Sequence, residues 1–513
     1  MLVHIILYLT DLMISNELKH HALASTSQDK ADSDHLSDAI SSILPALKAF
    51  YEFKGDDLAG RNVEEWKQRL GTPLPVTGEG LDAVLKELIE TVIPNGLRNG
   101  HPGFSGWVTT SPTSSGAAAH LAASIAGSQR YWIQAFNYLE TVSLNWLKEL
   151  LELPDSWQGT YTSGGSSANL IGLGAARQWA YEQIGIDPSS IGIGGAPPFR
   201  IYASTEVHHV VNRAAAVLGI GRRSVVGIPT DSAHRLDVAE LEKQLKADAL
   251  KGIRPMALVA TAGTVNIGSI DPIDQMADLA EQYGAWLHVD GAYGLFGKLD
   301  ERVKPLYKGL ERADSAAADP HKWLAAPLGN GVTFVRDASI LARAFTLEPA
   351  AYLEGSTLQD GNVVSPFDDF GIPFFDFNLD QSAPSRGVAV WAILKEIGAS
   401  GFKERVVRHN SFARLVAERV ENDPCLEVVA EPVLSICCFR YNNGKLSEEE
   451  MNRLNALIAA RLRSESQFVP STTVVKGRYA IRPCYINPRG REMDVTGLVE
   501  RVSELGNEMW QQD

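Results

Sequence analysis

The sequence predicts an α/β protein with a mainly parallel central sheet and flanking helices, a helical N-terminal segment and a smaller α+β C-terminal domain. Three observations lead to this prediction. Short β-rich apolar runs, such as MALVATAG and WLHVDGAYG, alternate with helical stretches in the middle of the chain. Only helical periodicity precedes them. Long helical patterns mixed with a few apolar runs follow them.

Length and composition limit the classes of protein that are possible. A chain of 513 residues with 45% hydrophobic content is long enough for two or three domains with a sizeable core. The net charge of −15 argues against nucleic acid or an anionic membrane surface as a partner. The chain has four cysteines, none of which forms a CxxC pair, and they are Cys425, Cys437, Cys438 and Cys484. We therefore expect no metal site, no disulfide framework and a cytoplasmic location.

The N-terminal part divides into two segments. Residues 1–35 are predicted to be a poorly ordered extension. Their apolar run, LVHIILYLTDLMI, is too short to span a bilayer and lacks a basic start, so we expect no membrane anchor. Residues 36–104 show apolar clusters at helical spacing, as in LSDAISSILPALKAFYEF. This helical segment has an apolar face that needs a partner surface.

The large domain is predicted over residues 105–385 and the small domain over 386–513. In the large domain, the helical stretches VHHVVNRAAAVLG and IDQMADLAEQYG separate the apolar runs RIYAST, SVVGIP, MALVATAG, WLHVDGAYG and GVTFV. This alternation is typical of βαβ units and a parallel sheet. In the small domain, a long helix starts with GVAVWAILKEIG and a second helix runs from Ser447 to about Ser464. LSICCFRY and RYAIRPCYI are its apolar runs.

A Gly-Ser run, TSGGSSANL, precedes a helix in the large domain. Gly164 and Gly165 allow backbone N–H groups to approach a ligand closely, and Ser166, Ser167 and the helix N-terminus favour an anion. The run is therefore a candidate phosphate-binding loop. The alternative is an ordinary turn with an N-cap.

A carboxylate ends the nearly pure apolar run WLHVDGAYG. Asp290 is costly at such a position unless it meets a positive group, and the ends of parallel strands are where α/β proteins bind ligands. Ala292 would leave room beside it for a flat ligand. The alternative is that Asp290 caps the next turn.

Two further motifs contain groups that suit the same chemistry. His208 and His209 start a helix after a strand, where one imidazole could stack on an aromatic ring and the other would pack or cap. ADPHKWL places His321 and Lys322 side by side. In this order, a phosphate loop, a histidine, a strand-end acid and a lysine form the set of groups that binds pyridoxal 5′-phosphate.

At these motifs the sequence resembles the group II pyridoxal-phosphate-dependent amino acid decarboxylases of fold type I, which include the aromatic-L-amino-acid decarboxylases. The resemblance rests on HKW, on HVDGAYG and on TSGGSSANL, where Ser167 replaces a usual Glu, and it covers roughly residues 95–510. It implies that Lys322 forms the Schiff base, that Asp290 bonds the pyridine nitrogen and that His208 stacks on the ring. It further implies a homodimer and the following cofactor contacts: Gly165, Ser166 and His321 at the phosphate, Ala292 under the ring, and Thr264 and Asp319 as supports.

The expected activity is decarboxylation of an L-amino acid to the amine and CO2. The aromatic residues of two pocket-like segments favour an aromatic side chain, although several could be core residues. Arg482 either meets a substrate carboxylate or is structural. The aromatic candidates are Phe104 and Trp107 in one segment and Tyr131, Trp132 and Phe136 in the other.

One departure from the family pattern concerns the product. The family has a loop tyrosine that helps to protonate the substrate carbon, whereas SPFDDFGIPFFDFNLDQSAPSRG contains none. Phe374 takes its place, and Tyr352 is a weaker substitute. Phenylalanine at this position resembles relatives that form an aldehyde by oxidative deamination, which is the main alternative. A carbon–carbon lyase on the same scaffold is the other.

Overall fold

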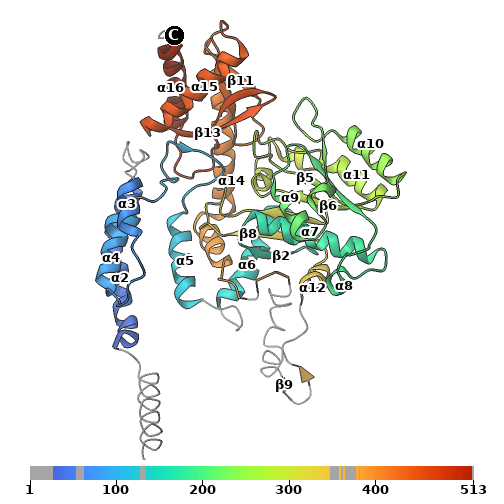
Figure 1. Ribbon diagram of the computed structural model, residues 1–513, viewed down its shortest axis with the longest axis horizontal. Helices are drawn as coiled ribbons and strands as arrows, with labels where there is room; N and C mark the ends of the chain where they lie inside the picture. The colour runs from blue at the N-terminus through green and yellow to red at the C-terminus, as the bar shows by residue number, and fades with distance from the viewer. Residues whose placement is uncertain are drawn as a thin grey trace, which may run out of the picture. The chain divides into compact units, whose positions relative to one another are not determined.

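The computed structural model describes residues 27–52, 63–127, 135–346, 358–359, 362–363, 377–380 and 382–510. They belong to two compact units, and the first unit ends at Arg98 and the second begins at Asn99 (Figure 1). The second unit contains both large sheets. Among the described helices, none is both long enough and apolar enough to cross a membrane.

Among the described residues of the first unit, every regular element is a helix. Its helix α2 begins before the expected start near residue 36. Helices α3 and α4 bury no side chain, and Leu44 and Val84 are 59% and 54% exposed. The unit therefore presents apolar side chains to solvent. Its elements are α2 (Ser27–Tyr51), α3 (Val63–Leu70), α4 (Leu81–Glu87) and the short π-helix η1 (Leu88–Val92).

The central sheet of the second unit has seven strands in the order β2-β8-β7-β6-β5-β3-β4. Strands β7, β6, β5, β3 and β4 are parallel, and β8 is antiparallel to both β7 and β2. The predicted mainly parallel sheet is thus confirmed. The strands are β2 (Gln158–Thr162), β3 (Phe199–Ser204), β4 (Val225–Ile228), β5 (Arg254–Thr261), β6 (Trp286–Asp290), β7 (Ser315–Ala318) and β8 (Gly331–Val335).

Helices cover both faces of this sheet (Figure 1). Successive side chains of a strand point to opposite faces. Ala257 and Val259 of β5 therefore pack with α7 and α9, whereas Leu258 packs with α10 and α11. The helices of this layer are α6 (Ala135–Leu150), α7 (Gly165–Glu182), α8 (Pro188–Ile191), α9 (Val210–Val217), α10 (Val238–Ala249), α11 (Ile273–Tyr283) and α12 (Ser339–Phe345), with 3-10 turns η2 (Arg222–Ser224), η3 (Leu295–Leu299), η4 (Lys304–Tyr307) and η5 (Leu310–Arg312).

The second sheet has five strands in the order β1-β13-β14-β12-β11. Its edge strand β1 comes from a segment far away in the sequence and pairs in parallel with β13. This pairing brings the turn at Trp107 beside the C-terminal part of the chain. The strands are β1 (Phe104–Ser105), β11 (Leu426–Ala430), β12 (Cys438–Tyr441), β13 (Val469–Val475) and β14 (Arg478–Arg482).

Three helices accompany this sheet. Helix α15 starts directly after Ser447, as predicted, because Ser447 and Glu450 form a capping box. Helix α14 changes direction at Gly398, whose φ of 68° is incompatible with a regular helix. The helices are α14 (Gly387–Glu421), α15 (Glu448–Glu465) and α16 (Glu492–Trp510); α5 (Ser114–Ala126) packs against α14, and β9 (Leu358–Gln359) pairs with β10 (Asn362–Val363).

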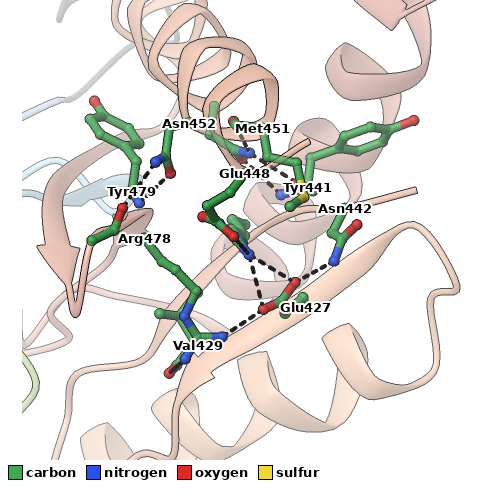
Figure 2. A network of polar contacts seen from close by, with 12 residues as sticks. Glu427, Val429, Tyr441, Asn442, Glu448, Met451, Asn452, Arg478 and Tyr479 are labelled. Carbon is green, nitrogen blue, oxygen red and sulfur yellow. Dashed lines mark hydrogen bonds and ion pairs between the residues drawn. The ribbon is translucent and has the colours of Figure 1, made fainter. Parts of the chain in front are cut away.

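Polar contacts join three neighbouring strands of the second sheet, β14, β12 and β11. Glu427 of β11 accepts hydrogen bonds from Arg478, at 2.8 Å, and from Asn442 (Figure 2). It also pairs with Arg440, which is buried and contacts Glu448 at the start of α15. The buried guanidinium therefore has two carboxylate partners, as such a charge requires. The contacts tie β11, β12, β14 and α15 together.

Candidate active site

Six strands of the central sheet end at the same edge, because β2 runs in the same direction as β3, β4, β5, β6 and β7. Ligands bind at such edges in α/β proteins. A cavity of about 700 Å³ opens there. It is lined by Trp107, Val108, Ser163, Gly164, Gly165, Ser166, Ser167, Asn169, His208, Val210, Thr261, Gly263, Val265, Asn266, Asp290, Ala292, Tyr293, Asp319, His321, Lys322, Leu328, Ser471, Thr472 and Arg482.

Lys322 lies in the turn after β7. Its Nζ is 2.9 Å from Oδ2 of Asp319, a carboxylate that is only 1% exposed. The other oxygen of Asp319 is buried, and no described group forms a hydrogen bond to it. His321 is fixed differently, through a 2.7 Å contact between its Nδ1 and the carbonyl oxygen of Asn330. The adjacent His321 and Lys322 both line the cavity.

The Gly-Ser loop between β2 and α7 approaches these residues closely. Gly164 has a φ of 137°, which favours glycine. A Cβ on Gly165 would lie 2.6 Å from Asp319 Oδ2 and 2.9 Å from the Ala292 side chain. A larger residue would therefore push the loop away from Asp319. No described side chain caps the start of the 18-residue helix α7, so its first N–H groups are available to an anion at the cavity.

Asp290 ends β6 and is 5% exposed. Its Oδ1 accepts hydrogen bonds from Asn169 Nδ2 and from the backbone N–H of Ala292, both at 3.2 Å. No described group donates to Oδ2, and the residue lines the cavity. The carboxylate therefore has one oxygen anchored in the protein and one left for a ligand.

His208 lies on the cavity wall after β3. Its Nδ1 accepts a 3.3 Å hydrogen bond from the backbone N–H of Val210, and its ring lies 4.1 Å from that of His209. Burial, and secondly the neighbouring His209, lower the pKa of His208. The imidazole is therefore neutral near pH 7, with its proton on Nε2.

Some predicted site residues do not line the cavity. Thr264 is fully buried, and its hydroxyl contacts Ser269 at 2.9 Å. Thr261, at the end of β5, lines the cavity instead. Phe104 is buried beneath Trp107, with ring centroids 6.0 Å apart. Phe136, although described, is also absent from the lining; Tyr131, Trp132, Tyr352 and Phe374 lie outside the described residues.

Arg482 is buried and makes four hydrogen bonds to protein oxygen atoms. Its Nε donates to Asn266 O at 2.9 Å, and its Nη1 donates to Trp107 O at 3.2 Å and to Ser471 Oγ at 2.9 Å. Its Nη2 donates to Val265 O. Arg482 thus joins three segments of the cavity wall. This arrangement favours the structural interpretation of Arg482.

Sequence reasoning did not identify Asn169 or Thr261. Asn169 lies one turn after Gly165 on α7 and bonds both the Gly165 carbonyl, at 2.8 Å, and Asp290. Asn169 stands four residues after Gly165 in the sequence, and residues at this spacing lie on the same face of a helix. This spacing could have identified it. Thr261 has no such signal, because the choice between it and Thr264 depends on the turn after β5.

The lining residues fit pyridoxal phosphate. Gly165 and the start of α7 suit the phosphate, Lys322 can bind the aldehyde, and the open oxygen of Asp290 can face the ring nitrogen. Around one cavity at the ends of parallel strands, this set of groups defines a pyridoxal-phosphate-dependent enzyme.

Comparisons with known proteins agree. Residues 64–442 match the pyridoxal-dependent decarboxylase conserved domain. An aromatic-L-amino-acid decarboxylase from Bacillus atrophaeus is 30% identical, with 86% of this chain and 89% of the relative covered. The acidic amino acid decarboxylase GADL1 of Mus musculus is 28% identical, with coverages of 87% and 81%. The crystal structure of Oryza sativa TDC with PLP and tryptamine superposes with a TM-score of 0.85 at 25% identity, over 93% of this chain and 98% of that one.

The chain belongs to the pyridoxal-dependent decarboxylases, and its activity is that of an amino acid carboxy-lyase with pyridoxal phosphate as cofactor. The resemblance inferred from HKW, HVDGAYG and TSGGSSANL is thereby confirmed. The relatives act on both aromatic and acidic amino acids, as their names state. Family membership therefore leaves the side chain of the substrate to be argued from the cavity.

Proposed function

We propose that this enzyme converts an L-amino acid with an aromatic side chain to the corresponding amine and CO2. Bound pyridoxal phosphate supplies the electron sink for the negative charge that develops when CO2 leaves. In this proposal Lys322 binds the cofactor aldehyde, Asp290 faces the ring nitrogen and His208 lies against the ring. Gly165, Ser166 and His321 bind the phosphate.

The protein groups have protonation states that suit these roles. An ionised Asp290 favours a protonated ring nitrogen, which strengthens the electron sink. Neutral His208 can lie against the ring without adding a positive charge that would compete with that proton. The pKa of His321 is lowered, mainly by burial, and its Nδ1 carries the proton of the neutral ring because it faces the carbonyl oxygen of Asn330. Its Nε2 can therefore donate to a phosphate oxygen only when the ring takes up a second proton, which the negative charge of the phosphate favours.

The observation that most supports an aromatic substrate concerns the cations of the cavity wall. Among the described lining residues, the two cations are Lys322, paired with Asp319, and Arg482, which bonds four oxygen atoms. An acidic side chain would therefore be desolvated without a dedicated cation. The exposed Trp107, together with Val108 and Leu328, offers apolar surface instead.

A panel of the twenty amino acids, with CO2, amine, aldehyde and peroxide measured together, tests this function. We expect kcat/KM for tryptophan, phenylalanine or tyrosine to exceed that for glutamate by about a hundredfold or more, because the carboxylate of a glutamate side chain would be desolvated in the cavity without a dedicated cation. Amine and CO2 should form in equal amounts. Aldehyde with peroxide would favour the oxidative alternative at Phe374, and aldehyde without CO2 would favour a carbon–carbon lyase.

We also propose that the enzyme is a homodimer in which the N-terminal helices cover a second copy of the chain. The exposed apolar side chains of α2 and α4 support this assembly, since such surface is normally buried in a partner. A reducing cytoplasm is the proposed location, because all four cysteines have free thiols and three of them are buried.

Light scattering checks the assembly. The wild-type protein should have twice the 55.8 kDa mass of one chain. The double variant Leu44→Lys, Val84→Lys should be largely monomeric, because each lysine places a charge on the apolar helices. Leu250→Lys, which changes an equally apolar side chain that is 90% exposed in the second unit, is the matched control and should stay dimeric. A monomeric wild type would refute the proposal.

A further inference from the structure

Three polar or amphipathic side chains of β6 point to the same side of the central sheet. Trp286, His288 and Asp290 alternate with Leu287 and Val289, so they face helix α7. His288 is fully buried, and both of its ring nitrogens have hydrogen-bond partners. Nδ1 is 2.8 Å from Ser315 Oγ, and Nε2 is 2.9 Å from Asn169 Oδ1.

These contacts form one continuous chain that ends at the proposed catalytic acid. Trp286 Nε1 donates to Ser315 Oγ at 2.8 Å. Ser315 contacts His288, and His288 contacts Asn169. Asn169 Nδ2 donates to Asp290 Oδ1 at 3.2 Å.

The chemistry at the two ends determines the direction of every hydrogen bond. The indole N–H can only donate, so Ser315 Oγ accepts it and directs its own proton to His288 Nδ1. At the other end, Asn169 Nδ2 faces two acceptors, Asp290 Oδ1 and the Gly165 carbonyl. Its Oδ1 must therefore face His288, and His288 Nε2 carries the proton. Each bond donates toward Asp290.

Packing fixes His288 in this tautomer and position. Ser315 is its direct partner in the pairing of β6 with β7. On the other side, a Cβ at Gly172 of α7 would lie 2.6 Å from the imidazole Cε1, so the helix backbone lies directly on the ring. Burial lowers the pKa of His288 to about 4, which agrees with a neutral ring at physiological pH.

We propose that His288 is a positioning residue that acts through Asn169 on Asp290. It aligns the Asn169 amide so that this amide donates to Oδ1 of the carboxylate, which stabilises the ionised acid and leaves Oδ2 directed at the cofactor nitrogen. The inference rests on the proposed role of Asp290. It adds that the acidity of the site is set by a buried chain of hydrogen bonds that reaches Ser315 and Trp286, beyond the groups that can touch the cofactor.

The variants His288→Leu and His288→Gln test this proposal in the holoenzyme. Leucine removes the donor to Asn169, whereas the glutamine amide can still donate to it. We expect His288→Leu to lower kcat about tenfold to hundredfold with little change in KM, as for other residues that orient a ligand-binding group. The pH midpoint of the cofactor absorbance should shift by about one unit, and cofactor should be lost faster on dilution. His288→Gln should restore much of each value.

Thr333→Val is the matched control. Thr333 is fully buried on β8 and donates to the Ala168 carbonyl of α7 at 2.8 Å, next to Asn169 but outside the chain of contacts. It should lower the melting temperature of the cofactor-free protein as His288→Leu does, without moving the pH midpoint. If His288→Leu does not fold, Ser315→Ala should still move the pH midpoint of the cofactor absorbance, by less than the shift expected for His288→Leu.

Two outcomes would overturn the inference. One is a shift of the midpoint by Thr333→Val as large as that by the His288 or Ser315 variants, which would indicate a purely structural role. The other is an effect of His288→Leu that persists undiminished when Asp290→Asn is already present, because the two residues would then act independently. If Asp290→Asn itself retains full activity, the proposed function of Asp290 fails instead, and the comparison separates the two failures.

Discussion

Replacing Lys322 with alanine is expected to abolish turnover, with a loss of at least about a thousandfold in kcat, and to remove the visible absorbance of covalently bound cofactor. The ε-amine is the group that can bind the aldehyde at this site. The variant also removes the ammonium group that, among the described residues, pairs with Asp319, whose carboxylate is 1% exposed. Leaving that charge unpaired should cost about 3 kcal/mol of stability in the cofactor-free protein.

Lys322→Arg separates these two effects. The guanidinium can still pair with Asp319, so the cofactor-free variant should unfold at nearly the wild-type denaturant concentration, yet it cannot form the covalent link. Absorbance spectra, turnover and urea unfolding of both variants provide the measurements. Wild-type turnover in either variant would contradict the role of Lys322, and equal stability of the two would contradict the importance of the ion pair.

Asp290→Asn is expected to retain part of the cofactor and to lose most of the rate, about a hundredfold to ten-thousandfold in kcat. Asparagine has nearly the same shape, and its Oδ1 can still accept from Asn169 and Ala292. The side chain becomes neutral, however, and places an N–H donor where the carboxylate oxygen faced the cavity. A protonated ring nitrogen then has no anion to stabilise it, so the electron sink weakens.

Single-turnover rates and cofactor content check this second prediction. Asp300→Asn is a matched control, because Asp300 is also buried, pairs with Arg302 and does not line the cavity. The control should lose stability and keep its rate. A rate for Asp290→Asn within a few-fold of wild type would mean that the carboxylate does not act on the reacting cofactor.

Much of the fold follows from local sequence patterns. The run WLHVD becomes β6 and GVTFV becomes β8, because β-branched and aromatic residues suit a pleated, buried strand. The start of α15 follows from its capping box. Strand β7, in contrast, is the sequence SAAA, which has little strand propensity. It is a strand because it is buried between β6 and β8, which is a property of the sheet and not of the segment.

Much of the candidate site also follows from the sequence. The motifs around Gly165, His208, Asp290 and Lys322 were predicted to meet, and all four residues line one cavity. The reason is general: parallel strands bring the loops at their carboxyl ends to the same edge. The sequence could not predict that Thr261, and not Thr264, lines the cavity, because this depends on the turn after β5. It also could not predict that Arg482 bonds four oxygen atoms, because this depends on strands of the other sheet.

The sequence by itself determined which reactive groups this enzyme has and the end of the sheet at which they gather, since local propensities and the parallel-strand rule need no long-range information. Only the tertiary structure decided which atoms face one another. The chain of contacts from Trp286 through His288 to Asp290 joins β6, β7 and α7, and its hydrogen bonds depend on separations near 3 Å between these elements. Packing of the helix on the sheet sets those separations, and no short stretch of sequence encodes that packing.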